Sequence, residues 1–117
     1  MKNLGTAVTF WKRSDGALLG YSADGHSGYA EAGADIVCAA ISALTQSTLN
    51  GLKNVLKAPV MFDQDDGGAF IEAILTPEAT EEEIQLAQLL LVTLCDALQA
   101  IQREYPRNLR IIFRERR

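Results

Sequence analysis

The chain has 117 residues, of which 48% are hydrophobic and 22% are charged. This length and balance are those of one globular domain with its own core, and they exclude a disordered tail, a collagen-like repeat and a disulfide-stapled mini-protein. The 11 Lys and Arg residues against 15 Asp and Glu residues leave a formal net charge of −4. Because phosphate neutralisation needs a basic surface, this acidic chain is not expected to bind nucleic acid directly.

The composition also bears on compartment and metal binding. Residues 1–6 contain no apolar signal-peptide core, and the apolar run 89–94 is far shorter than the ~20 residues of a membrane span. We therefore expect a cytoplasmic protein with no membrane partner. With two cysteines and one histidine in the chain, a four-ligand zinc site of Cys and His cannot be assembled within one copy, and a reducing cytosol disfavours a Cys38–Cys95 disulfide.

In the first half, residues 3–12 and 17–23 have β-favouring composition and flank Asp15-Gly16, which predicts a hairpin with a type I′ turn. The next segment, 24–33, contains three glycines and predicts a loop. Apolar residues then recur at spacings of three and four, which predicts a helix over 34–57 with Asp35 as its N-cap.

In the second half, residues 60–62 and 69–75 predict two strands joined by a turn at 63–68. Thr80 to Glu83 fits a capping box, so a second helix should begin there and end near Tyr105, before a proline. Residues 109–113 predict a last strand. The order hairpin, helix, hairpin, helix, strand predicts a single α+β domain over residues 1–117, with two helices packed on a mixed sheet.

Apolar residues cover more than one face of the second helix. They are Ile84, Leu86, Ala87, Leu89, Leu90, Leu91, Val92, Leu94, Cys95, Leu98 and Ile101. Such a helix is either the central core helix or is covered on one side by another subunit. We expect a homodimer.

One pair of residues suggests nucleophilic chemistry. His26 lies in the glycine loop, and Cys38 follows 12 positions later, in the first turn of the predicted helix. Unpaired backbone N–H groups and the helix dipole at that place favour a thiolate, and an imidazolium nearby would stabilise it further. The alternative is that Cys38 is a small core residue, as Cys95 is among its leucine neighbours.

The segment 25–42 reads GHSGYAEAGADIVCAAIS. It closely resembles the signature G-H-x-G-Y-A-x-x-G-x-D-I-V-C-A-A-x-S of the bacterial ribosomal-processing cysteine protease (Prp) family. The order of predicted elements resembles that family's small α/β domain over essentially the full length.

The resemblance implies a homodimeric, cofactor-free cysteine endopeptidase. It implies that the substrate is a large-subunit ribosomal protein, from which a short N-terminal extension is cut after a pair of aromatic residues. The family's catalytic residues fall on His26 and Cys38, and residues 27–33 fall on a loop that orders over the substrate.

Further residues are candidates for substrate binding or for supporting the dyad. Besides capping the helix, Asp35 is a candidate to orient His26, and Ser42 lies one turn beyond Cys38. Candidates for contacting the peptide or its aromatic rings are Gly25, Gly28, Tyr29, Met61 and Phe62.

Two other functions stay open at this point. The chain could be a non-catalytic ribosome-associated binding module that holds the same ribosomal protein, in which case Cys38 would be unreactive. A thiol-redox protein is the weakest alternative, because the chain has no C-x-x-C motif.

Overall fold

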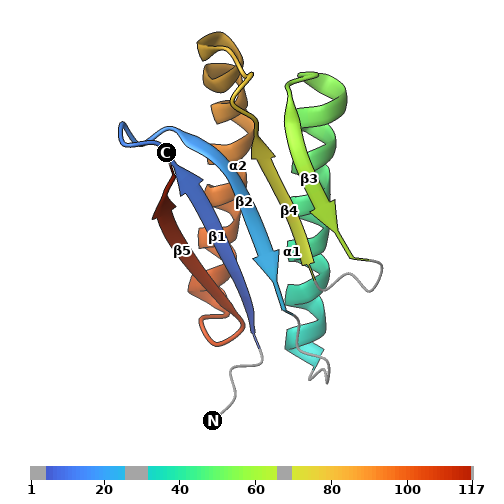
Figure 1. The fold of residues 1–117 in the computed structure, drawn as a ribbon. Helices are drawn as coiled ribbons and strands as arrows, with labels where there is room; N and C mark the ends of the chain where they lie inside the picture. The colour runs from blue at the N-terminus through green and yellow to red at the C-terminus, as the bar shows by residue number, and fades with distance from the viewer. Residues whose placement is uncertain (1–4, 26–31, 66–69, 117) are drawn as a thin grey trace.

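The computed structural model describes residues 5–25, 32–65 and 70–116, and it has the predicted order of elements. The elements are β1 (Thr6–Lys12), β2 (Leu18–Asp24), α1 (Ala32–Asn50), a π-helical turn (Gly51–Val55), β3 (Val60–Gln64), β4 (Phe70–Leu75), α2 (Glu81–Glu104) and β5 (Leu109–Glu115). The five strands form one sheet in the order β3-β4-β2-β1-β5, and both helices cover the same face of it (Figure 1). The predicted α+β fold is confirmed.

The sheet is mixed because it contains both antiparallel strand pairs and one parallel pair. Strands β1, β2, β4 and β3 pair with their neighbours in antiparallel fashion, whereas β5 pairs in parallel with β1. A parallel neighbour requires a long crossover, and helix α2 provides part of it on the covered face. Strands β3 and β5 are therefore the two edges of the sheet.

The turn between β1 and β2 lies where the Asp-Gly pair predicted it but has a different geometry. Gly16 N–H donates to the Arg13 carbonyl, and Gly16 has φ +93° while Asp15 does not have positive φ. A type I′ turn needs positive φ at both central residues, so that prediction was wrong. The chain forms a longer loop in which glycine alone takes the left-handed position.

The core lies between the sheet and the two helices. Phe10, Tyr21, Leu91 and Leu98 are completely buried, and the side chains of β1 alternate between buried and half-buried positions. Full burial of side chains of this size contributes about 1.5–3 kcal/mol each in transfer free energy. These contacts fix the position of α1 and α2 on the sheet.

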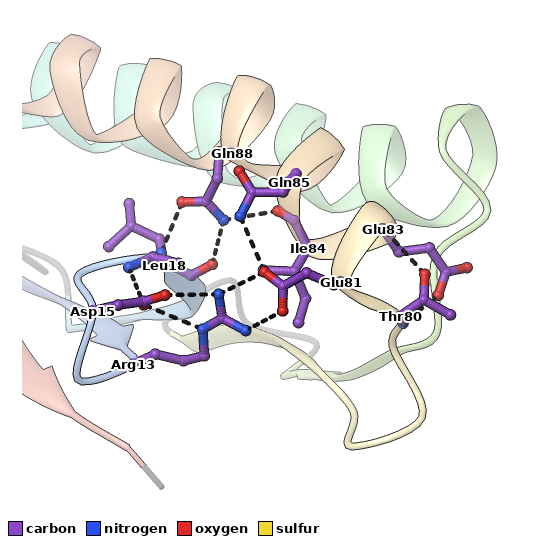
Figure 2. Close-up of polar contacts among 10 residues, drawn as sticks. Arg13, Asp15, Leu18, Thr80, Glu81, Glu83, Ile84, Gln85 and Gln88 are labelled. Carbon is purple, nitrogen blue, oxygen red and sulfur yellow. Dashed lines mark hydrogen bonds and ion pairs between the residues drawn. The ribbon is translucent and has the colours of Figure 1, made fainter.

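Helix α2 begins at the predicted capping box. Thr80 accepts from the Glu83 N–H at 3.1 Å, and the Glu83 carboxylate accepts from the Thr80 N–H at 2.8 Å. The same end of the helix is held to the β1–β2 hairpin, because Arg13 donates to both carboxylate oxygens of Glu81 at 2.8 Å (Figure 2). The Gln88 side chain adds bonds to the backbone N–H and carbonyl of Leu18.

By length and mean hydropathy alone, α2 would be able to cross a membrane. In the fold, however, one of its faces supplies core residues such as Ala87, Leu91 and Leu98. A core helix of a small domain passes the same test, so the hydropathy of α2 agrees with its place against the sheet.

Helix α1 departs from the prediction at both ends. It begins at Ala32 rather than residue 34, and the α-helix gives way after Asn50 to the π-helical turn. At Gly51 a Cβ atom would lie 2.9 Å from the Leu90 Cδ1 atom, so glycine there permits the close approach to α2. Lys57, with φ +54°, then directs the chain back toward β3.

Candidate active site

Cys38 lies at the border of the buried stripe of α1. Val37, Ile41 and Thr45 point into the core and are almost fully buried, whereas Ile36 is 61% exposed on the opposite side. Cys38 itself has intermediate burial. The Cys38 residue is therefore partly exposed rather than fully buried in the core, and partial exposure is typical of reactive cysteines.

The helix start does not lie where the thiolate argument needs it. Because α1 begins at Ala32, Asp35 is a helical residue rather than the N-cap, and Cys38 lies in the second turn. The effect of a helix dipole falls off within the first turn, and only the first four N–H groups lack a helical partner. The predicted contribution of the helix N-terminus to activating Cys38 was therefore wrong.

Helix α1 is held on the sheet by a buried hydrogen bond about two turns beyond Cys38. The Tyr21 hydroxyl, from β2, donates to the Thr45 carbonyl at 2.6 Å. Burial of the Tyr21 side chain raises its pKa above the ordinary value, so the hydroxyl keeps its proton and remains a donor. This bond ties the backbone of α1 to the centre of the sheet.

The second cysteine has a different environment. Cys95 is 8% exposed and faces the core from α2, as the sequence predicted. Burial, and secondarily the charge of Asp96, raise the pKa of the Cys95 thiol. A buried thiol with a raised pKa is a poor nucleophile, so of the two cysteines Cys38 is the candidate.

Strand β2 is followed by a conformationally constrained residue, immediately before His26 in the sequence. Gly25 follows β2, has φ +92°, and its carbonyl accepts from the Thr6 hydroxyl at 3.0 Å. A residue with a Cβ atom would be strained there. This gives Gly25 a structural role in directing the chain out of β2.

Several predicted site residues cannot be placed. His26, Gly28 and Tyr29 lie outside the described residues, and the side chain of Asp35 is likewise not described. Their assignments remain predictions. Figure 1 shows that β2 ends near the first turns of α1, so the described elements on either side of residues 26–31 lie at one end of the sheet.

Ser42 is exposed and lines a small cavity beside Cys38's helix. The cavity has a volume of about 90 Å³ and is lined by Ser42, Thr45, Gln46, Gln64, Asp65, Phe70 and Ile71. Ser42 lies four positions after Cys38, so the two share a helix face about 6 Å apart along the axis. The cavity thus brings the end of β3 and the start of β4 to Ser42, one helical turn from the candidate nucleophile.

Two other predicted residues lie on β3. Met61 is 54% exposed and Phe62 is 46% exposed, so neither is a core residue. The Lys53 ammonium lies 4.0 Å from the centre of the Phe62 ring. Sequence reasoning missed Gln46 and Gln64, because only the packing of α1 against the β3–β4 hairpin brings these polar residues together.

The family model for cysteine protease Prp matches residues 6–110 of this chain. The chain belongs to the cysteine protease Prp family. The match spans β1 to the beginning of β5, so the described site lies within it.

Relatives at the sequence level carry one name. The ribosomal processing cysteine protease Prp of Bacillus subtilis (strain 168) is 32% identical over 106 residues, which is 89% of this chain and 93% of that protein. The ribosomal processing cysteine protease Prp of Staphylococcus aureus (strain Mu50) is 31% identical over 100 residues, covering 86% and 91% of the two chains.

Solved structures share the fold. The ribosomal processing protease Prp from S. aureus in complex with a substrate peptide has a TM-score of 0.79 at 27% identity, covering 93% of this chain and 99% of that one. The same protease with a covalently linked product peptide has a TM-score of 0.78 at 28% identity, with the same coverage. A Streptococcus mutans protein has a TM-score of 0.80 at 25% identity, covering 96% of each chain. Family and fold together identify this chain as a cysteine protease.

Proposed function

We propose that this protein is an endopeptidase that removes the N-terminal extension of a large-subunit ribosomal protein in the cytoplasm. The observation that carries the proposal is the position of Cys38, which is accessible at the edge of the buried stripe of α1 while Cys95 faces the core. The names of the B. subtilis and S. aureus relatives support the ribosomal substrate. The S. aureus complexes with peptides support peptide binding by this fold.

In the proposed reaction, the Cys38 thiolate attacks the carbonyl carbon of the scissile peptide bond. The carbon–nitrogen bond breaks, the His26 imidazolium donates its proton to the leaving amine, and a thioester with Cys38 remains. Water, deprotonated by His26, then hydrolyses the thioester and restores the thiolate. Because Cys38 lies in the second turn of α1, the imidazole is the group we propose to activate it. Asp35, three positions before Cys38, is the candidate to orient that imidazole.

The test is cleavage of the host's own ribosomal protein, with its N-terminal extension, analysed by mass spectrometry. Cys38→Ala and His26→Ala should each remove cleavage, and Cys95→Ala is the matched control because it deletes the other thiol. Circular dichroism should show that all three variants are folded. Cleavage by Cys38→Ala at the wild-type rate would refute the assignment, and a wild-type protein that binds the substrate without cutting it would indicate a binding module.

We also propose that the protein is a homodimer that pairs through α2. Leu86, Leu89 and Val92 are 45%, 69% and 52% exposed, and their spacing places them in one stripe on the helix side opposite the core. Large exposed apolar stripes of this kind mark association surfaces. Analytical ultracentrifugation should give twice the chain mass for the wild type and the chain mass for Leu89→Glu. If the wild type is still a monomer at a protein concentration of about 100 µM, the proposed dimer is wrong.

A further inference from the structure

Strand β3 is an edge that lacks the usual protection. It is the outermost strand of the sheet, and no other described segment pairs with its outer side. The opposite edge, β5, carries Arg110, Arg114 and Glu115, and charges of this kind discourage pairing with another chain. Strand β3 carries one charged residue and exposes Met61 and Phe62 instead. Because β5 also exposes an apolar residue, Phe113, the smaller number of charges is what makes β3 the edge that is suited to receive a further strand.

The register shows which backbone groups of β3 point outward. Just beyond the ends of β3, the Thr76 N–H donates to the Pro59 carbonyl and the Asp65 N–H donates to the Phe70 carbonyl. Both bonds continue the register of the β3–β4 strand pair. In an antiparallel pair, residues that bond to the partner alternate with residues that do not. The N–H and carbonyl groups of Val60, Phe62 and Gln64 therefore point away from β4.

The outer edge of β3 leads toward the candidate nucleophile. Its last residue, Gln64, lines the small cavity together with Ser42 and Gln46 of α1. Cys38 lies one helical turn before Ser42, about 6 Å along the axis. In Figure 1, β3 runs toward the same end of the sheet as the first turns of α1. A chain laid along β3 and continued past Gln64 thus approaches Cys38.

We propose that the substrate peptide binds as a sixth strand on β3 and that this pairing delivers its scissile bond to Cys38. The backbone of the peptide exchanges hydrogen bonds with Val60, Phe62 and Gln64, which provides affinity without reading side chains. Alternate side chains of the peptide then lie on the two sides of the sheet, one set beside Phe62 and the other beside Met61. The occupant is a peptide in extended conformation, and the inference rests on the proposed protease function.

The first test is an N-methyl scan of the substrate peptide, which removes one backbone N–H at a time. If the peptide is a strand, kcat/KM falls by about 5-fold or more at every second position and changes little at the positions between. The stretch with this alternation lies on one side of the scissile bond. A scan without alternation overturns the proposal.

The second test changes the edge of the protein. Phe62→Pro removes an outward N–H that does not bond to β4, and proline is tolerated at edge positions of this kind. Phe62→Ala is the matched control, since it removes the ring and keeps the N–H. We expect Phe62→Pro to have a kcat/KM about 5-fold or more below that of Phe62→Ala, with equal alkylation of Cys38 by iodoacetamide in the two variants. Equal cleavage by the two variants overturns the proposal.

Binding separates this inference from the proposed function. The peptide is titrated, by fluorescence polarisation, into two double variants, Cys38→Ala with Phe62→Ala and Cys38→Ala with Phe62→Pro. Weaker binding by the variant with Phe62→Pro supports strand addition even if the wild type cuts nothing, in which case only the protease function fails. Equal binding overturns strand addition, as does a change of oligomeric mass in Phe62→Pro, which would show that β3 pairs with a second copy.

Discussion

Replacing Tyr21 by phenylalanine tests whether a single buried hydrogen bond holds α1, and with it Cys38, on the sheet. The Tyr21 side chain is fully buried, and its hydroxyl donates to the Thr45 carbonyl at 2.6 Å. Phe fits the same space and leaves no buried donor without a partner. The loss is therefore that of one neutral hydrogen bond, about 1 kcal/mol of the free energy of unfolding. For a chain of this size, that lowers the melting temperature by about 3–6 °C at pH 7.

The pH dependence makes this prediction sharper. Burial raises the pKa of Tyr21 in the folded protein above its value of about 10 in the unfolded chain. The stability that depends on the neutral hydroxyl is therefore complete below pH 10 and is lost as the pH rises above it, by about 1.4 kcal/mol for each pH unit. At pH 11 this loss equals or exceeds the contribution of the hydrogen bond. The Tyr21→Phe protein should then be as stable as the wild type or more stable.

Urea unfolding at pH 7 and pH 11 measures both effects. Tyr105→Phe is the control, because the Tyr105 residue is 37% exposed and its replacement should leave stability unchanged at pH 7. The reasoning fails if Tyr21→Phe is as stable as the wild type at pH 7. It fails equally if the deficit seen at pH 7 persists undiminished at pH 11.

Three further predictions follow from individual contacts. In the native protein, iodoacetamide at pH 8 should modify Cys38 at least about tenfold faster than Cys95, whose pKa is raised by burial, and equal rates in peptide mapping would contradict this. The hydrogen bond from Arg13 lowers the pKa of Glu81 to about 2, so the stabilisation by this pair is present above pH 4.5 and is lost as the pH falls toward 2. Glu81→Gln should therefore be less stable than the wild type at pH 7 and equally stable at pH 2 in urea titrations, and an unchanged difference would refute the ion pair's role. Gly20→Ala should lower the free energy of unfolding by about 1–3 kcal/mol or more, because the new Cβ atom would lie 2.2 Å from a backbone oxygen of β4. A melting temperature within about 2 °C of the wild-type value would contradict this and show that the two strands can move apart.

Local rules were sufficient for most of the secondary structure. The capping box at Thr80 is formed as predicted, because its two hydrogen bonds join residues three positions apart. The predicted hairpin at Asp15-Gly16 was confirmed in position, although the turn type was wrong. The choice of turn depends on how the two strands align, and the register of β1 on β2 shifts between Trp11 and Lys12.

The start of α1 shows where local rules failed. Asp35 is a good cap by residue type, but the helix begins three residues earlier, at Ala32. Short-range preferences for capping are worth only about 1 kcal/mol, so residue type alone does not fix where a helix begins. The environment expected for Cys38 changed as a result.

The sequence by itself determined the order of the elements, the motif that joins His26 to Cys38, and the burial of Cys95 among its leucine neighbours. Each of these depends on residues that are close along the chain or on one helical period. Only the tertiary structure decided that β4 lies between β3 and β2, that β3 is an edge of the sheet, and that Gln64 and Ser42 line one cavity next to α1, the helix that carries the candidate nucleophile. These features come from contacts between segments far apart in the chain, whose free energy depends on burial in the assembled core rather than on any local pattern.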